Sequence, residues 1–144
     1  MTTVNPYLSF KGNCEEAFNF YKSIFGGDFQ YVGRYKDAPV ADQKNFASEG
    51  ADKIMHISLP ISEQTILMGC DSMEAFGQTT LVGSNISLTI TTDSKLKADQ
   101  IFKGLSAGGK IKMEMNETFW GAYFGMFTDK YGIHWMINFE SQGK

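Results

Sequence analysis

The segment NPYLSF (residues 5–10) is followed directly by KGNCEEAFNFY (residues 11–21), and this pair carries the strongest signal of the fold. The first segment alternates apolar and polar residues as a β-strand does, and the second has the spacing of an amphipathic helix. About eighty residues later NISLTI (residues 85–90) alternates again, and a helical pattern follows over residues 94–105. Strand-like segments without a further helix follow each pair. The sequence therefore predicts an α+β fold of two tandem βαβββ modules, over residues 4–71 and 84–140.

The first helix has recognisable start and stop signals. Glu16 follows Asn13 at the spacing of a capping box, so we expect the Asn13 side chain to accept from the first backbone N–H groups of the helix. Gly26 and Gly27 then end the helix. The expected apolar faces are Ala17, Tyr21, Ile24 and Phe25 in the first helix, and Ala98, Ile101, Phe102 and Leu105 in the second.

The remaining segments are typical of strands and loops. A polar stretch over residues 36–50 is either a loop that covers a site or plain surface, and residues 71–83 connect the two modules. Residues 129–132 (DKYG) form a hairpin-type turn that ends in glycine. The other expected strands are residues 28–35, 53–61, 65–70, 110–116, 120–128 and 133–139.

Composition narrows the class of protein. A chain of 144 residues that is 42% hydrophobic can bury one substantial core, so we expect a single domain over residues 1–144 whose two modules share it. A net charge of −3 with scattered lysines argues against nucleic acid as a partner. No segment approaches the roughly 18 apolar residues of a membrane span, and residues 1–6 lack the features of a secretory signal. We therefore expect a cytoplasmic protein with no membrane partner. Cys14 and Cys70 lack a CxxC spacing, which favours two free thiols.

Several segments together resemble the PhnB-like branch of the glyoxalase/bleomycin resistance protein/dioxygenase (vicinal oxygen chelate) superfamily, whose members are often labelled 3-demethylubiquinone-9 3-methyltransferase-like. They are YLSFKGNCEEA (7–17) with FY (20–21), MHI (55–57), WGAYFG (120–125) and DKYGIHW (129–135). The resemblance covers nearly the whole chain. It implies paired βαβββ modules whose curled mixed sheets surround a cup-shaped cavity, and commonly a homodimer.

The resemblance also implies where a divalent metal would be held. Metal-using relatives carry a ligand, typically His, Gln or Glu, on the first and last strand of each module. Here those positions fall at about Asn5 or Pro6, at Met68, at Asn85 and at about Met136. Amide and thioether groups are poor donors to Zn²⁺, Ni²⁺ or Fe²⁺. We therefore expect neither a metal nor another cofactor.

Strand alternation divides the side chains between a cavity face and a helix face. Leu88, Ile90, Ile133, Trp135 and Ile137 are expected on the helix side. His56 is the candidate catalytic residue, because a strand histidine in a cavity can act as general base or donor, although it could equally be a hydrogen-bonded structural group. Cys70 is either a nucleophile beside His56 or a buried apolar group. The expected ligand-binding residues, each of which could instead fill a core, are Tyr7, Ser9, His56, Met68, Asn85, Ser87, Trp120, Phe124, Met136 and Asn138.

Two functions remain open. One is a binding protein that buries a small, partly hydrophobic molecule without a metal. The other is a lyase, isomerase or dioxygenase that uses an unconventional metal set or His56. Methyl transfer is disfavoured, because no strand leads into a Gly-rich turn and helix with an acid on the next strand, as a Rossmann-like cofactor site requires. Fold alone does not choose between the two.

Overall fold

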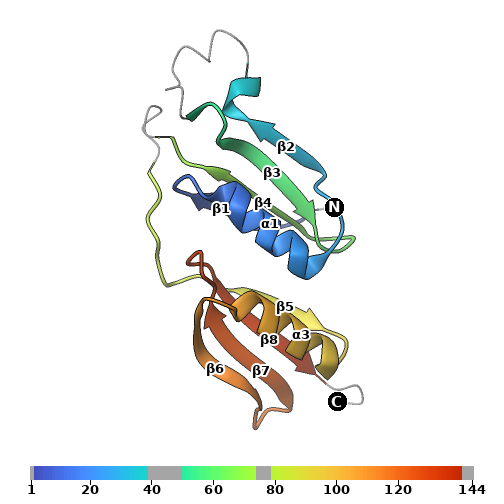
Figure 1. Cartoon of the computed structure of the whole chain (residues 1–144). Coiled ribbons are helices and arrows are strands. Elements are labelled where there is room, and N and C mark those ends of the chain that lie inside the picture. Colours follow the sequence, from blue (N-terminus) through green and yellow to red (C-terminus); the bar gives the residue numbers. More distant parts are fainter. Residues whose placement is uncertain (1, 39–49, 74–78, 141–144) are drawn as a thin grey trace. The chain divides into compact units, whose positions relative to one another are not determined.

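The computed structural model describes residues 2–38, 50–73 and 79–140. The chain divides into two compact units, Met1–Leu81 and Val82–Lys144, each with one four-stranded sheet. A long helix accompanies each sheet (Figure 1). The predicted pair of βαβββ modules is therefore confirmed. That the two modules share one core stays a prediction.

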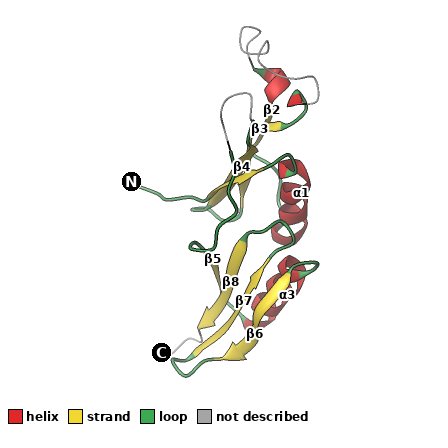
Figure 2. Ribbon diagram, turned by 90° about the vertical axis from the view of Figure 1, so that its left-hand side faces the viewer, coloured by secondary structure: helices red, strands yellow, loops and turns green. Residues whose placement is uncertain are grey.

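The first unit has a mixed sheet in the order β1-β4-β3-β2. Strand β1 is parallel to β4, and the other neighbours are antiparallel. Figure 2 shows α1 lying on one face of this sheet. The elements are β1 (Tyr7–Phe10), α1 (Cys14–Phe25), β2 (Tyr31–Arg34), the short 3-10 helix η1 (Tyr35–Asp37), β3 (Ile54–Pro60) and β4 (Ile66–Asp71). The predicted covering loop falls largely on residues 39–49, outside the described residues.

The second unit repeats this topology as β5-β8-β7-β6, with β5 parallel to β8. Helix α3 lies on one face of its sheet (Figure 2). The Ser94 side chain caps this helix by accepting from the backbone N–H of Lys97 at 3.1 Å. The elements are β5 (Leu88–Thr92), α3 (Lys95–Ser106), β6 (Lys110–Glu117), β7 (Ala122–Thr128) and β8 (His134–Glu140). None of the helices in the described residues is long and apolar enough to cross a bilayer.

Each helix packs on its sheet through a phenylalanine that lies over a glycine. A Cβ on Gly69 would come within 2.7 Å of the Phe18 ring, and one on Gly125 within 2.8 Å of the Phe102 ring. These rings can approach the strands only where no side chain intervenes. The buried side of α1 consists of Cys14, Ala17, Phe18 and Tyr21. The prediction for Ile24 and Phe25 was wrong, because both are only half-buried. The predicted buried stripe of α3 is confirmed.

Asp71 holds the start of α1. Its Oδ1 accepts hydrogen bonds from the backbone N–H groups of Gly12 and Cys14, and its Oδ2 accepts from that of Ile54, each at 2.9 Å. The predicted capping role of the Asn13 side chain was wrong, because Asn13 makes no side-chain capping bond and a carboxylate from β4 binds these N–H groups instead. Burial, and then the nearby Asp71, raises the pKa of the Cys14 thiol.

Asp129 plays a comparable part in the predicted turn before β8. Its Oδ1 accepts from the backbone N–H groups of Tyr131 (2.8 Å) and Ile133 (3.0 Å), and its Oδ2 accepts from the indole N–H of Trp135 (2.8 Å). Gly132 has φ +92° and donates to the Asp129 carbonyl at 3.0 Å. The turn predicted over residues 129–132 is confirmed.

Candidate functional site

The face of the first sheet opposite α1 carries the candidate site. Along β1, β3 and β4 the residues that point toward α1 are buried: Leu8, Phe10, Ile57, Leu59 and Leu67. The alternate positions point to the other side, called here the open face. Strand register places two rows across this face, Tyr7–Met68–Ser58–Tyr31 and Ser9–Cys70–His56–Gly33. The predicted residues Tyr7, Ser9, His56 and Met68 are thus brought to one face.

Tyr7 and His56 are in direct contact on this face. The Tyr7 hydroxyl lies 3.2 Å from His56 Nδ1, and the two ring centroids are 5.6 Å apart. Burial, followed by the sulfur of the adjacent Cys70, raises the pKa of the Tyr7 hydroxyl well above its ordinary value. Tyr7 therefore stays protonated and can donate to the imidazole. With Nδ1 accepting, the neutral imidazole carries its proton on Nε2, which remains a donor.

Tyr31 completes the group, and Gly33 makes its position available. The rings of Tyr31 and His56 lie 5.7 Å apart. A Cβ on Gly33 would meet the Tyr31 hydroxyl at 2.6 Å, so the phenol ring folds back across the strand position that has no side chain. We call Tyr7, His56 and Tyr31 the tyrosine–histidine cluster. About half of each tyrosine side chain is exposed, 48% for Tyr7 and 49% for Tyr31.

Cys70 lies beside this cluster. Ile57 pairs with Gly69 in antiparallel register, so the next positions, His56 and Cys70, are cross-strand neighbours. Side chains at such positions approach to about 5 Å between Cβ atoms. Cys70 is a half-buried free thiol. The structure shows that the strands of His56 and Cys70 are neighbours, whereas a role of Cys70 as nucleophile stays a prediction.

The second sheet has an open face of different chemistry. Its central row is Thr89–Met136–Met126, and the next is Thr91–Asn138–Phe124–Asn116. The predicted residues Phe124, Met136 and Asn138 share this face. Trp120 lies in the turn before β7, 58% exposed, with its ring 6.2 Å from that of Phe124. The combination of these residues with His56 in one pocket stays a prediction.

Asn85 and Ser87 were wrongly predicted as strand residues. Strand β5 begins only at Leu88, which pairs with Trp135, and both predicted residues are exposed ahead of it. The pairing with β8 begins at Leu88 and Trp135, one residue after the start of β8 at His134. His134 Nε2 is hydrogen-bonded to the Gly83 carbonyl at 2.7 Å, which holds the approaching chain. Thr89 and Thr91 therefore occupy the open-face positions of β5.

The positions that correspond to the family's metal ligands do not suit a hard divalent ion. Asn5 precedes β1, and its amide oxygen accepts from the backbone N–H of Ile66 at 2.9 Å. Met68 and Met136 present thioethers, and Asn85 lies outside the sheet. Amide and thioether groups are weak ligands for Zn²⁺ or Ni²⁺. Among the described residues, no three His, Cys, Asp or Glu side chains gather as a metal cluster.

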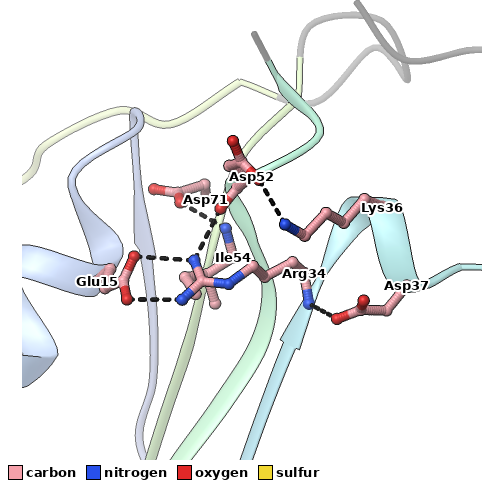
Figure 3. Close-up of polar contacts among 7 residues, drawn as sticks. All are labelled: Glu15, Arg34, Lys36, Asp37, Asp52, Ile54 and Asp71. Carbon is pink, nitrogen blue, oxygen red and sulfur yellow. Dashed lines mark hydrogen bonds and ion pairs between the residues drawn. The ribbon is translucent and has the colours of Figure 1, made fainter. Parts of the chain in front are cut away.

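A polar network surrounds the start of α1 (Figure 3). Arg34 donates two hydrogen bonds to the Glu15 carboxylate, at 2.8 and 2.7 Å, and a third to the Asp52 carbonyl at 2.9 Å. Lys36 binds the Asp52 carboxylate at 2.8 Å. The hydrogen bond from Arg34 lowers the pKa of Glu15, and that from Lys36 lowers the pKa of Asp52.

This network borders a recess of about 310 Å³, lined by Gly12, Glu15, Asp52, Lys53, Ile54 and Asp71. The polar groups that line it already have partners in the chain. Lys53 Nζ donates to the Gly12 carbonyl at 2.8 Å, and Asp71 binds three backbone N–H groups. The recess is therefore best explained as the junction that fixes α1 to β2 and β3, and the open face remains the stronger candidate site.

The sequence interpretation missed Asp71, Tyr31 and Gly33. Tyr31 and Gly33 lie in a short, alternating segment, and a glycine two positions after a tyrosine was a signal that the ring could fold back. Asp71 ends an apolar alternating strand, where an acid has to be buried or turned outward. The signal at Asp71 does not identify its partners, because Gly12, Cys14 and Ile54 lie 59, 57 and 17 residues away.

The fold defines the class of protein. A glyoxalase/bleomycin resistance protein/dioxygenase family enzyme from Burkholderia phytofirmans PsJN has the same fold, with a TM-score of 0.61 and 17% identity over 94% of this chain and 95% of that one. The paired mixed sheets, each with one helix, are thus those of the glyoxalase/bleomycin-resistance class.

Sequence similarity then shows the family. Residues 2–138 match the family described as 3-demethylubiquinone-9 3-methyltransferase, and the chain belongs to this family. It is 32% identical to protein YjdN of Escherichia coli (strain K12), over 96% of both chains. It is also similar to protein PA1353 from Pseudomonas aeruginosa, with a TM-score of 0.85 and 34% identity over 99% of this chain and 100% of that one. The predicted place in the PhnB-like branch is confirmed.

Proposed function

We propose that this protein binds a small, partly hydrophobic molecule at the tyrosine–histidine cluster. The observation that carries the proposal is the contact of His56 with Tyr7 and Tyr31, two half-exposed rings on a sheet face that α1 does not cover. Aromatic side chains exposed side by side are costly to a protein in water and are typical of binding surfaces. A ligand that covers them would be stabilised by the apolar area removed from water.

The polar groups of the cluster favour a ligand with a hydrogen-bond acceptor. The Tyr7 hydroxyl lies 3.2 Å from His56 Nδ1, and because its raised pKa keeps it protonated it can donate to that nitrogen. In that tautomer His56 presents Nε2–H, and the Tyr31 hydroxyl and Ser9 add further donors on the same face. The site thus suits a planar or aromatic molecule that carries a carbonyl, carboxylate or phenolate oxygen.

The proposal does not include a catalytic divalent metal or methyl transfer. Asn5, Met68, Asn85 and Met136 stand where related proteins would hold the metal, and none is a good donor to a hard ion. The mixed sheets of the two units also differ from the doubly wound parallel sheet on which a Rossmann-type cofactor would bind. The protein is accordingly proposed to bind its ligand with side chains alone.

The test uses 8-anilinonaphthalene-1-sulfonate, an aromatic anion whose fluorescence rises in apolar sites. We expect saturable binding by the full chain, and His56→Ala should weaken it by about 1–3 kcal/mol, the cost of removing a buried hydrogen-bond partner. The matched control is His134→Ala, since both nitrogens of that ring are engaged by Thr128 and Gly83. Equal affinity for the wild type and His56→Ala would contradict the proposal.

A second candidate is catalysis that depends on His56. It is favoured by the Tyr7–His56 hydrogen bond, which orients the ring, and by the cross-strand position of Cys70. His56→Gln separates the two candidates, because glutamine can donate and accept but cannot act as a base. A binding protein keeps its affinity in this variant, whereas an enzyme keeps affinity and loses turnover of the bound compound.

We also propose a homodimer. Both sheets have open edges, and large apolar side chains such as Phe119 (98% exposed) lie at the surface. Light scattering at micromolar concentration should then give twice the 16.1 kDa mass of the chain. A mass of one chain would contradict this proposal.

A further inference from the structure

The contact between Tyr7 and His56 spans a strand. Tyr7 lies on β1 and His56 on β3, and β4 lies between these two strands. Neighbouring strands are about 4.8 Å apart, so the backbones of β1 and β3 are roughly 10 Å apart. The Tyr7 hydroxyl is nevertheless only 3.2 Å from His56 Nδ1. The two side chains therefore meet above the open face of β4.

Cys70 lies on β4 beneath this contact. Leu67 and Asp71 are buried on the helix side, so Met68 and Cys70 alternate to the open face. Burial raises the pKa of Tyr7, and Cys70 raises it further through its charge and through a hydrogen bond with the Tyr7 hydroxyl. That hydrogen bond places the thiol beside the hydroxyl that also contacts the imidazole.

The two cysteines of the chain differ in access. Cys14 of α1 is 0% exposed, and burial, followed by the nearby Asp71, raises the pKa of its thiol. Cys70 is half-buried on the open face. Ser9, which pairs with Cys70 on β1, has a short side chain and is exposed. A small molecule on this face can therefore reach the sulfur of Cys70, whereas Cys14 belongs to the core.

The three side chains provide a path for a proton. A phenol hydroxyl donates one hydrogen bond and accepts others, so Tyr7 can accept from the Cys70 thiol while it donates to His56 Nδ1. Transfer along this chain leaves a thiolate and an imidazolium, and Tyr7 keeps a proton throughout, as its raised pKa requires. The thiolate is the nucleophilic form of cysteine.

We propose that Cys70 forms a covalent bond with an α,β-unsaturated carbonyl compound bound at the tyrosine–histidine cluster. This inference rests on the proposed binding at the cluster and names the class of ligand. Such compounds are planar and carry a carbonyl oxygen, the two features that the exposed rings and the hydrogen-bond donors of the cluster favour. Their β-carbon is electrophilic, and the thiol lies beneath the rings that hold the ligand.

The addition needs neither a leaving group nor a redox partner. The Cys70 proton passes through Tyr7 to His56 Nδ1, and the sulfur forms a bond to the β-carbon. The electrons of the carbon–carbon double bond shift toward the carbonyl, whose oxygen becomes an enolate oxygen stabilised by the imidazolium. The proton then returns from His56 to the α-carbon. The product is a saturated carbonyl compound that is joined to Cys70 by a thioether.

The experiment follows adduct formation on the full chain by mass spectrometry with N-phenylmaleimide, a planar compound with a conjugated carbonyl. We expect one adduct per chain, located at Cys70 by peptide mapping, with a rate that saturates as the reagent concentration rises. Tyr7→Phe and His56→Gln should lower the maximal rate by at least about tenfold, since general-base catalysis typically contributes roughly 10²–10⁴-fold. His134→Ala is the matched control and should leave the rate unchanged, because both nitrogens of that ring have partners outside the cluster.

Separate measurements distinguish binding from bond formation. Cys70→Ser should form no adduct and should bind 8-anilinonaphthalene-1-sulfonate as the wild type does, whereas failure of the wild type to bind this dye contradicts the proposed function. An unmodified Cys14 verifies that each variant is folded, since its thiol is buried. The covalent step is overturned if Cys70 reacts no faster than glutathione at the same pH, or if Tyr7→Phe and His56→Gln react at the wild-type rate. The ligand class is overturned if the protein accelerates alkylation by iodoacetamide, which forms no enolate, as strongly as addition to N-phenylmaleimide.

Discussion

Replacing Asp71 by asparagine should destabilise the first unit strongly, although the two side chains have almost the same shape. The aspartate accepts three backbone hydrogen bonds, from Gly12, Cys14 and Ile54, and is 1% exposed. Asparagine retains one acceptor oxygen and turns an NH₂ group toward a backbone N–H. An unsatisfied buried donor costs about 1–3 kcal/mol. The two remaining bonds become neutral ones of roughly half the strength, which adds about 1 kcal/mol.

The expected loss is therefore about 2–4 kcal/mol, a large part of the stability of a small domain. Urea unfolding should show it as a lower midpoint with an unchanged slope. Hydrogen exchange should also speed up at the Gly12, Cys14 and Ile54 amides before it does elsewhere. The control is Asp52→Asn, an exposed carboxylate in the same network, which should leave the midpoint nearly unchanged (Figure 3). If Asp71→Asn and Asp52→Asn unfold at the same urea concentration, the assignment of Asp71 as the anchor of α1 is wrong.

Three other predictions follow from the same geometry. Gly33→Ala should weaken binding of the anilinonaphthalene probe with little change in melting temperature. The new Cβ would lie only 2.6 Å from the Tyr31 hydroxyl and would push the ring away. Equal affinity of the variant and the wild type would contradict the role given to Tyr31. Arg34 lowers the pKa of Glu15, so this pair stabilises the protein at neutral pH, and the contribution disappears as pH falls through the lowered pKa. Because both side chains are partly exposed, the contribution to stability is under about 1 kcal/mol. The melting temperature of Arg34→Gln should therefore fall less than that of the wild type between neutral pH and about pH 3. Added Zn²⁺ or Ni²⁺ should not raise the melting temperature, and a rise that EDTA reverses would show a divalent site.

The fold could be predicted because local periodicity and tertiary burial agree in this chain. The helical stripe of Ala98, Ile101, Phe102 and Leu105 is buried as its spacing requires. The alternation around Ile57 likewise predicts that His56 lies on the face away from α1, without reference to the partner strand. Elements of this kind are fixed by their own sequence, since a shift by one residue would expose the apolar set to water.

The start of α1 and the start of β5 could not be predicted in the same way. The capping pattern at Asn13 is a local signal, but the Asp71 carboxylate, distant in sequence, takes the donors that Asn13 would have bound. Similarly, NISLTI alternates from residue 85, yet a strand needs a partner, and pairing with β8 begins only at Leu88 and Trp135. Both errors arise where a long-range contact decides between two conformations that are locally acceptable.

The candidate site was predicted in part for the same reason. Alternation placed Tyr7 and His56 together, because their strands had clear patterns. Tyr31 was missed because the position of its ring depends on the space above Gly33, where no side chain lies. A glycine in a strand often marks such a close approach, but it leaves little trace in hydrophobic periodicity.

Comparison of the two units indicates which face carries function. On the helix side each has a cross-strand glycine and isoleucine, Gly69 with Ile57 and Gly125 with Ile137, and in each a phenylalanine of the helix lies over the glycine. The glycine lies on β4 in the first unit and on β7, which occupies the place of β3, in the second. In both units it leaves room for the phenylalanine ring of the helix. On the open side the equivalent rows are chemically different: Tyr7–Met68–Ser58–Tyr31 in one unit and Thr89–Met136–Met126 in the other. Helix packing constrains only the first of these faces, so the packing of α1 does not account for the two half-exposed tyrosines on the second. The proposed ligand at the tyrosine–histidine cluster is a physical reason for them that the first unit does not share with the second.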